Sequence, residues 1–248
     1  MRKPYIIEYA CSCVVGKVRK NNEDNFFCDG IIRKEPDLND DVSVNGEVKS
    51  DENSLFAVFD GMGGEACGEI ASYIAAQNCI GFYESRAQYD EYLHELLCEL
   101  NDRVLEETSA RSLVLMGSTA AMIQFNKKRI YVANAGDSRI YKLSKKDFKQ
   151  ISCDHTLNTG KGKAPLTKFL GTPDKAGLAP FIAYGAYKTG DMFILCTDGV
   201  YDMVDEDSMK AVFSQKKELQ VLCDEIIKKA LENGGVDNAT VILCRIKK

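Results

Sequence analysis

Residues 55–72 read LFAVFDGMGGEACGEIAS, and this stretch shows how the chain is built. The apolar run FAVFDG at 56–61 predicts a buried strand that ends in a glycine turn. From Glu65 onward, the spacing of isoleucines among small residues predicts a helix. A strand that ends at Asp60-Gly61 places a carboxylate at the edge of a sheet, where the backbone can come close to other groups.

The same alternation of strands and helices continues on both sides of this stretch. Residues 5–15 are β-branched and aromatic and predict a strand, and further strands are predicted at 120–125, 130–135, 139–143, 192–196 and 239–246. Helical spacing of large apolar residues predicts two more helices, around 93–104 and 219–231. Strands joined by hairpin-length turns and mixed with long helices indicate antiparallel sheets covered by helices.

Two segments are predicted to be loops. Residues 33–54 are rich in Asp, Glu, Asn and Ser and poor in apolar side chains, and residues 157–180 are rich in Gly, Lys, Pro and Thr. We interpret both as solvated connections. Because the second segment lies between two of the motifs described below, we expect it to border an active site.

Composition limits the class of protein. The chain has 248 residues, 45% hydrophobic and 28% charged, which fits one globular domain or two small ones and excludes wholesale disorder. A net charge of -5 makes no electrostatic case for nucleic-acid binding. No apolar run approaches the roughly 20 residues of a membrane helix, and Pro4 and Glu8 interrupt any signal-peptide core. We therefore expect a cytoplasmic protein that binds neither nucleic acid nor membranes, with its ten cysteines reduced.

Acidic residues gather at the predicted strand ends. Asp60, Asp137 and Asp198 each follow a strand, Asp237 precedes one, and the pair Glu23-Asp24 lies just before Asn25-Phe26-Phe27. Carboxylates that converge at one edge repel one another and require cations. A ligand set made only of oxygen suits magnesium, manganese or calcium. Any single Asp-Gly pair is also typical of an ordinary turn, so the pattern by itself indicates a hard-metal site without excluding turns.

An ordered series of motifs resembles the metal-dependent protein phosphatases, the type 2C serine/threonine family, in their compact bacterial form. The series runs through RKNNEDNFF (19–27), LFAVFDGMGGEACGEIAS (55–72), MGSTAA (116–121), IYVANAGDSRIYKL (130–143), CDHT (153–156), PLTKFLG (165–171), GDMFILCTDGVYDMV (190–204) and GGVDNATVILCRI (234–246). The resemblance implies an α+β fold, a four-layer α-β-β-α sandwich of two antiparallel sheets packed face to face with helices on both outer faces. It also implies one catalytic domain over 1–248, in which the flap segment at 157–180 is shorter than in bacterial relatives.

The resemblance carries a binuclear Mn²⁺ or Mg²⁺ centre onto named residues. By that analogy Asp60 bridges both ions, Asp198 and Asp237 hold one of them, the Gly61 carbonyl and Glu23 serve the other, and Asp24 supports the cluster. Asp137 and Asp202 match the residues that hold a third metal in bacterial members, and Arg19 matches the arginine that binds phosphate. A hydroxide shared by the two ions would then attack phosphorus in line, while Arg19 donates two hydrogen bonds to the phosphoryl oxygens.

The expected function is therefore hydrolysis of phosphoserine and phosphothreonine in proteins. The family analogy adds a bacterial Ser/Thr kinase and its targets as context, and a monomer is the default expectation. Two alternatives remain open from the residues. One is an inactive phosphoprotein-binding module on the same fold. The other is a cysteine-dependent phosphatase, because Cys13-Val14-Val15-Gly16-Lys17-Val18-Arg19 fits a Cys-x-x-Gly-x-x-Arg phosphate loop.

Overall fold

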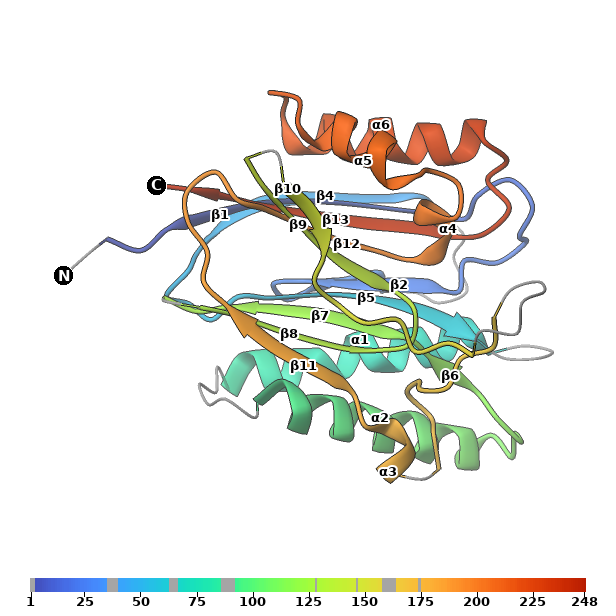
Figure 1. Cartoon of the computed structure of the whole chain (residues 1–248). Helices are drawn as coiled ribbons and strands as arrows, with labels where there is room; N and C mark the ends of the chain where they lie inside the picture. Colours follow the sequence, from blue (N-terminus) through green and yellow to red (C-terminus); the bar gives the residue numbers. More distant parts are fainter. Residues whose placement is uncertain are drawn as a thin grey trace.

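The fold has four layers. The structure, a computed structural model, describes residues 3–34, 40–62, 67–85, 92–127, 129–145, 147–157, 164–173 and 175–248. Two sheets face each other, and helices cover the outer face of each sheet (Figure 1). Within each sheet the paired strands run antiparallel. The predicted α+β sandwich is therefore confirmed.

The first sheet lies under the C-terminal helices. In the described part of the chain it has six strands in the order β10 (Asp147–Gln150), β9 (Arg139–Ser144), β12 (Met192–Cys196), β13 (Ala239–Lys247), β1 (Ile6–Val14) and β4 (Val42–Lys49). Helices α5 (Glu206–Phe213) and α6 (Leu219–Glu232) cover its outer face, and the short α4 (Asp198–Tyr201) lies at one end (Figure 1).

The second sheet lies over the N-terminal helices. Its order is β11 (Phe181–Gly185), β8 (Ile130–Ala135), β7 (Ala120–Phe125), β5 (Leu55–Met62), β2 (Asp24–Cys28) and β3 (Ile31–Ile32), and β6 (Gly117–Ser118) pairs with the end of β5. Helices α1 (Gly68–Ser85) and α2 (Tyr92–Ala110) cover its outer face, with the short α3 (Lys175–Leu178) beside α2.

Each interface between layers has its own apolar core, and strand β5 shows why. Side chains alternate across a strand, so Phe56 and Val58 pack between the two sheets, whereas Ala57 and Phe59 pack against α1 and α2. Both faces of β5 are buried, which explains why FAVF is continuously apolar. A third cluster fills the space between the first sheet and α5 and α6.

Part of the predicted loop at 33–54 is a strand, so the prediction of a solvated connection is wrong there. Strand β4 pairs with β1 over its whole length, with Ile6 opposite Lys49. Val42, Val44 and Val48 are half-buried against the core between the sheets and alternate with exposed polar side chains. Residues 35–39 lie outside the described residues, as do 158–163 and 174 of the predicted flap at 157–180.

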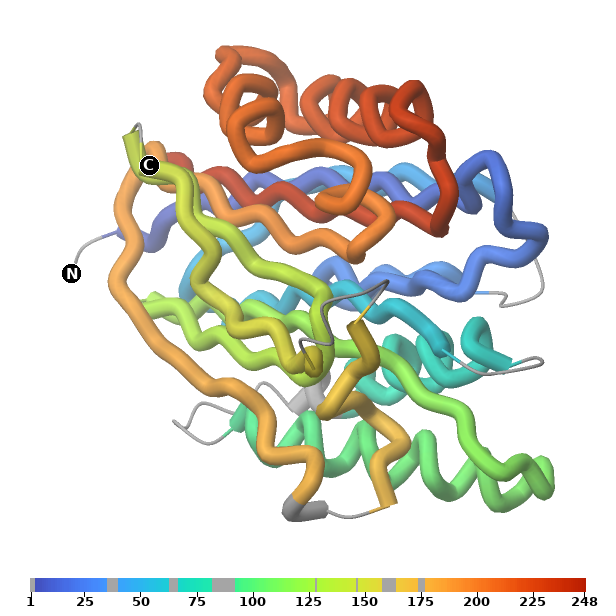
Figure 2. The backbone as a smooth tube through the Cα atoms, turned by 45° about the vertical axis from the view of Figure 1, so that its right-hand side comes forward, coloured from blue at the N-terminus to red at the C-terminus, as the bar shows by residue number. Residues whose placement is uncertain are grey.

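The topology brings the candidate site residues to one end of the sandwich. The loop from β1 to β2, the end of β5, helix α4 and the start of β13 all lie at the right of Figure 1. Both chain termini lie at the opposite end, since Ile6 pairs with Lys247 (Figure 2). Across the described residues, no helix combines the length and the apolar character needed to cross a membrane.

Candidate metal centre

The predicted site residues come from five segments that meet at this end. Asp24 opens β2 directly opposite Asp60 of β5, and Asp198 opens α4 immediately after β12. Gly61 lies within β5, which continues to Met62 and pairs there with β6, so the predicted glycine turn at the end of FAVFDG is wrong. The remaining predicted residues lie in adjoining connections, namely Arg19 and Glu23 before β2, Asp137 between β8 and β9, Asp202 after α4 and Asp237 before β13.

Two glycines allow these segments to approach closely. A Cβ atom on Gly61 would lie 2.0 Å from the Gly68 carbonyl oxygen and 2.6 Å from that of Glu23. A Cβ atom on Gly199 would lie 1.9 Å from the Asn238 carbonyl oxygen. Only glycine tolerates such contacts, so Gly61 in β5 and Gly199 in α4 are required for the close approach of these segments.

Asn238, which the sequence analysis did not single out, connects two of the segments, the start of β13 and the loop between β1 and β2. Its side chain is buried, and its Oδ1 accepts a hydrogen bond of 2.8 Å from the Glu23 N–H. Its Nδ2 donates to the carbonyl oxygens of Val15 at 2.8 Å and Asn21 at 2.9 Å. Asn238 therefore fixes the loop that carries Arg19 and Glu23 against the start of β13. The only sequence signal was its place after Asp237 in the motif.

Arg19 contacts two of the predicted ligands directly. Its Nη2 donates a hydrogen bond of 2.8 Å to Oδ2 of Asp237, and its Nη1 lies 4.0 Å from Oε2 of Glu23. The bond to Asp237 is the largest cause of a raised pKa of the Arg19 guanidinium. Since 47% of the Arg19 side chain is exposed, its remaining donors can reach a ligand from solvent.

Asp24 is the most deeply buried carboxylate of the group. Its Oδ2 accepts hydrogen bonds from Thr197 Oγ1 at 2.8 Å and Thr240 Oγ1 at 2.7 Å. Its Oδ1 is buried and accepts no hydrogen bond from the part of the chain that the structure describes. Burial first, and then the charges of Asp198 and Asp237, raise the pKa of Asp24 to about 7. A nearby cation would relieve both the burial and the repulsion.

Glu23 has a similar electrostatic environment. Burial raises the pKa of its carboxyl group, and the charges of Glu69 and Asp237 add to this, while Arg19 opposes it. Excess negative charge therefore collects where solvent is scarce. A donor set of carboxylate and carbonyl oxygens suits Mg²⁺ or Mn²⁺, so the residues present fit the expected pair of ions in their chemistry.

The described carboxylate side chains at this end of the sandwich are not arranged as a complete set of metal ligands. Among the described residues, no group of three or more His, Cys, Asp and Glu side chains is gathered closely enough to hold a metal ion. Asp237 accepts its hydrogen bond from Arg19 instead. The backbone nevertheless places Asp24 opposite Asp60, and the charges of Asp198 and Asp237 act on Asp24.

Two cavities adjoin the carboxylates. One of about 300 Å³ is lined by Asp60, Met62, Thr119, Asp137, Ala164, Pro165, Leu166 and Asp198. The other, of about 400 Å³, is lined by Asp137, Arg139, Asp154, Thr156, Ala164, Asp198, Tyr201 and Asp202. Asp137 and Asp198 line both cavities. The described part of the predicted flap also borders the site, as expected.

Arg139, Asp154 and Tyr201 form one wall of the second cavity, and none of them was a predicted site residue. Arg139 donates to Asp154 Oδ2 at 2.7 Å from Nη2 and at 3.0 Å from Nε. Its guanidinium carbon lies 3.7 Å from the centre of the Tyr201 ring, and the Tyr201 hydroxyl donates to the Asp137 carbonyl oxygen at 3.0 Å. The motifs GDSRIY and CDHT contained Arg139 and Asp154 but gave no sign of their pairing.

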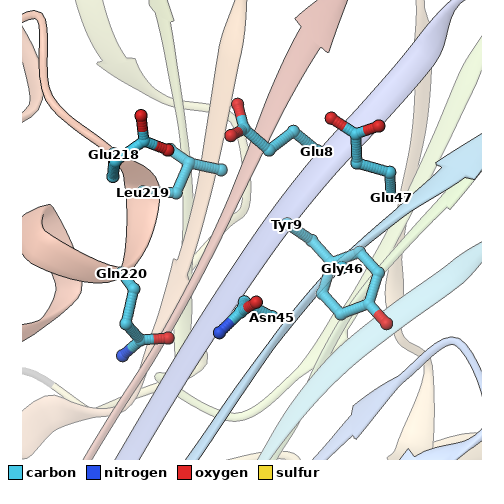
Figure 3. A pocket seen from close by; sticks show the side chains of 8 residues that line it. All are labelled: Glu8, Tyr9, Asn45, Gly46, Glu47, Glu218, Leu219 and Gln220. Atoms are coloured by element: carbon cyan, nitrogen blue, oxygen red, sulfur yellow. The ribbon is translucent and has the colours of Figure 1, made fainter.

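A further cavity, also of about 300 Å³, lies where the first sheet meets the start of α6 (Figure 3). It is lined by Glu8, Tyr9, Asn45, Gly46, Glu47, Glu218, Leu219 and Gln220, from β1, β4 and the start of α6. Lys247 pairs with both Glu8, at 3.1 Å, and Glu47, at 2.9 Å. Arg245 also lies 3.5 Å from Glu8, so these two cations offset part of the negative charge of the three glutamates that line the cavity.

The structure argues against Cys13 as a nucleophile. Cys13 is fully buried in β1, and burial is the largest cause that raises the pKa of its thiol to about 11. Its sulfur accepts hydrogen bonds from Asn22 Nδ2 at 3.3 Å and Thr240 Oγ1 at 3.1 Å. The residues that follow, up to Glu23, are all described and form no helix. A reactive cysteine needs a low pKa and access to substrate, and Cys13 has neither.

Comparisons with known proteins agree with these features. The family model for protein phosphatase 2C matches residues 32–233. The serine/threonine phosphatase Stp of Listeria welshimeri is 29% identical over 250 residues, covering 92% of this chain and 91% of the relative. The serine/threonine protein phosphatase PstP of Mycobacterium tuberculosis is 26% identical over 265 residues, covering 99% of this chain and 46% of PstP.

Solved structures of the same kind share the fold. PppA of Pseudomonas aeruginosa has a TM-score of 0.78 at 25% identity, covering 99% of this chain and all of that one. The catalytic domain of PstP, in complex with two manganese ions, has a TM-score of 0.80 at 24% identity, covering 98% of this chain and 100% of that chain. The chain therefore belongs to the protein phosphatase 2C family of metal-dependent phosphoprotein phosphatases.

Proposed function

We propose that the chain hydrolyses phosphoserine and phosphothreonine monoesters in proteins at a binuclear Mn²⁺ or Mg²⁺ centre. The observation that carries the proposal is the cluster of carboxylates at one end of the sandwich, where the buried Oδ1 of Asp24 and the raised pKa of Asp24 indicate excess negative charge. The two manganese ions of the PstP complex support the same metal content.

The residues have separate roles in this proposal. Asp60 would hold both ions, Asp198 and Asp237 one of them, and the Gly61 carbonyl and Glu23 the other. Asp24 would support the cluster through Thr197 and Thr240, to which it is hydrogen-bonded. Asp137 and Asp202 would hold a third ion beside the second cavity, which they line together. Two bound ions supply a nucleophile from water near neutral pH.

Arg19 binds and orients the phosphoryl group. Its planar guanidinium can donate two parallel hydrogen bonds to phosphate. Since it lies 2.8 Å from Asp237 and 4.0 Å from Glu23, a phosphate on its exposed side lies next to these carboxylates. The positive charge of the Arg19 guanidinium also stabilises the negative charge that develops on the phosphoryl oxygens in the transition state.

Hydrolysis of a phosphothreonine peptide tests the proposal. The purified protein is treated with a chelator and then supplied with Mn²⁺ or Mg²⁺, next to Asp198→Asn and Cys13→Ser variants of confirmed fold. We expect activity only with metal, a loss of orders of magnitude in Asp198→Asn, and full activity in Cys13→Ser. A folded protein without activity in any metal supports the binding-module alternative, and loss of activity in Cys13→Ser supports the cysteine mechanism.

The biological setting is proposed on family analogy alone. We propose a single catalytic domain over 1–248, a monomer in the cytoplasm, and substrates that a bacterial Ser/Thr kinase phosphorylates. Sedimentation equilibrium of the purified protein tests the monomer. Phosphoproteomic comparison of cells with and without the Asp198→Asn variant tests the substrates, because a protein phosphatase that lacks activity should leave its targets phosphorylated.

A further inference from the structure

Two exposed valines stand beside Arg19 without a role in the core. Val18 is 64% exposed and Val236 is 48% exposed. Val18 precedes Arg19 in the loop from β1 to β2, and Val236 precedes Asp237 in the loop before β13. Single exposed apolar residues are normal on a protein surface, so the argument depends on how these two are placed relative to each other and to the site.

The two loops run side by side and are joined by hydrogen bonds before and after the valines. The Lys17 N–H donates a hydrogen bond of 2.8 Å to the Gly235 carbonyl oxygen, one residue before each valine. Arg19 donates its hydrogen bond of 2.8 Å to Asp237, one residue after each valine. Val18 and Val236 therefore lie between two direct links that join the same two loops.

Gly16 shows that this close approach is built into the backbone. Its φ is +83°, and a Cβ atom on it would lie 2.3 Å from the Asp237 carbonyl oxygen and 2.9 Å from that of Gly235. Only glycine fits that position. The pair of valines is thus held by rigid contacts, next to the arginine that the proposed function assigns to phosphate.

We propose that Val18 and Val236 bind an apolar side chain of the substrate that neighbours the phosphorylated serine or threonine. This inference rests on the proposed function, because it takes Arg19 as the phosphate-binding group. Val18 is the chain neighbour of Arg19 and Val236 that of Asp237, and adjacent Cα atoms are about 3.8 Å apart, so a peptide whose phosphate is held by Arg19 passes close to both exposed valines. An apolar neighbour removes valine surface from water and gains binding, whereas glycine gains little.

Two phosphothreonine peptides test the proposal. They have the same length and charge and differ only in whether leucine or glycine flanks the phosphothreonine. The measurement is kcat/KM for each peptide with the metal-loaded wild-type protein and the Val18→Ser/Val236→Ser double variant. Val221→Ser is the matched control, because Val221 is 43% exposed near the start of α6, about 16 Å of helix rise from the end of α6 that leads to Val236.

We expect the wild-type protein to prefer the leucine peptide by about five- to tenfold, as burial of part of two valines implies. The double variant should lose most of that preference through a higher KM for the leucine peptide, and Val221→Ser should keep it. No preference in the wild-type protein, or a preference that the double variant keeps, would overturn the inference and leave the proposed function standing. Hydrolysis of neither peptide by the metal-loaded wild-type protein would overturn both.

Discussion

Replacement of Asn238 by alanine tests whether one buried side chain holds the site segments together. The change removes three hydrogen bonds, from the Glu23 N–H and to the carbonyl oxygens of Val15 and Asn21. Each is worth about 1 kcal/mol net, and the groups left behind are poorly solvated. We therefore expect the free energy of unfolding to fall by about 3 kcal/mol, which lowers the Tm of a domain of this size by about 6–12 °C.

Urea denaturation of wild type and variant measures this loss. Asn233→Ala is the matched control, since the Asn233 side chain donates one exposed hydrogen bond, to the Met203 carbonyl oxygen at 2.7 Å, and should cost no more than about 1 kcal/mol. Asn238→Asp separates hydrogen bonding from volume, because it keeps the acceptor for Glu23 but turns an oxygen toward two carbonyl groups. A stable Asn238→Asp variant, or a loss below about 1 kcal/mol in Asn238→Ala, would refute the reasoning.

Two further predictions concern glycine packing and the buried thiols. Gly199→Ala should destabilise the fold strongly because its Cβ would lie 1.9 Å from the Asn238 carbonyl oxygen, whereas Gly81→Ala, with nothing within 4 Å in α1, should stabilise it by about 0.5–1 kcal/mol; thermal melts that ranked the two variants the other way would contradict this. Burial raises the pKa of Cys13 to about 11 and of Cys196 to about 12. These folded values exceed the ordinary 9.0, so the thiols' contribution to stability is complete below pH 9 and is lost as pH rises above it. The urea concentration at the unfolding midpoint should therefore be lower at pH 10 than at pH 8, and an equal midpoint at the two pH values would count against this reasoning.

Much of the architecture could be predicted from local patterns because long buried elements have strong signals. The FAVF run of β5 is apolar on both faces, and the leucines of α2 and α6 repeat at helical spacing. Strand β4 was missed because it lies at the edge of its sheet, where only alternate side chains are half-buried. Its valines at 42, 44 and 48 alternate with polar residues, and that weak signal was obscured by the acidic residues around it.

The sequence predicted which acidic residues belong to the candidate site, but it did not predict which side chains form hydrogen bonds with one another there. Asp24 and Asp60 lie opposite each other in paired strands, as carboxylates at strand ends suggested. The Arg19 bond to Asp237 joins side chains 218 positions apart, and the three bonds of Asn238 depend on how loops pack in space. Pairings of this kind follow from tertiary structure, which no local pattern in the sequence encodes.

Manganese binding to the chelator-treated protein tests the central claim most directly. Titration calorimetry on wild type and Asp60→Asn gives the number of ions bound per chain. We expect at least two ions per chain in the wild-type protein, two for the binuclear centre and a third if Asp137 and Asp202 also bind one, and loss of tight binding at the binuclear centre in Asp60→Asn. A folded wild-type protein that binds no manganese, or an Asp60→Asn variant that binds both ions as tightly as wild type, would contradict the account.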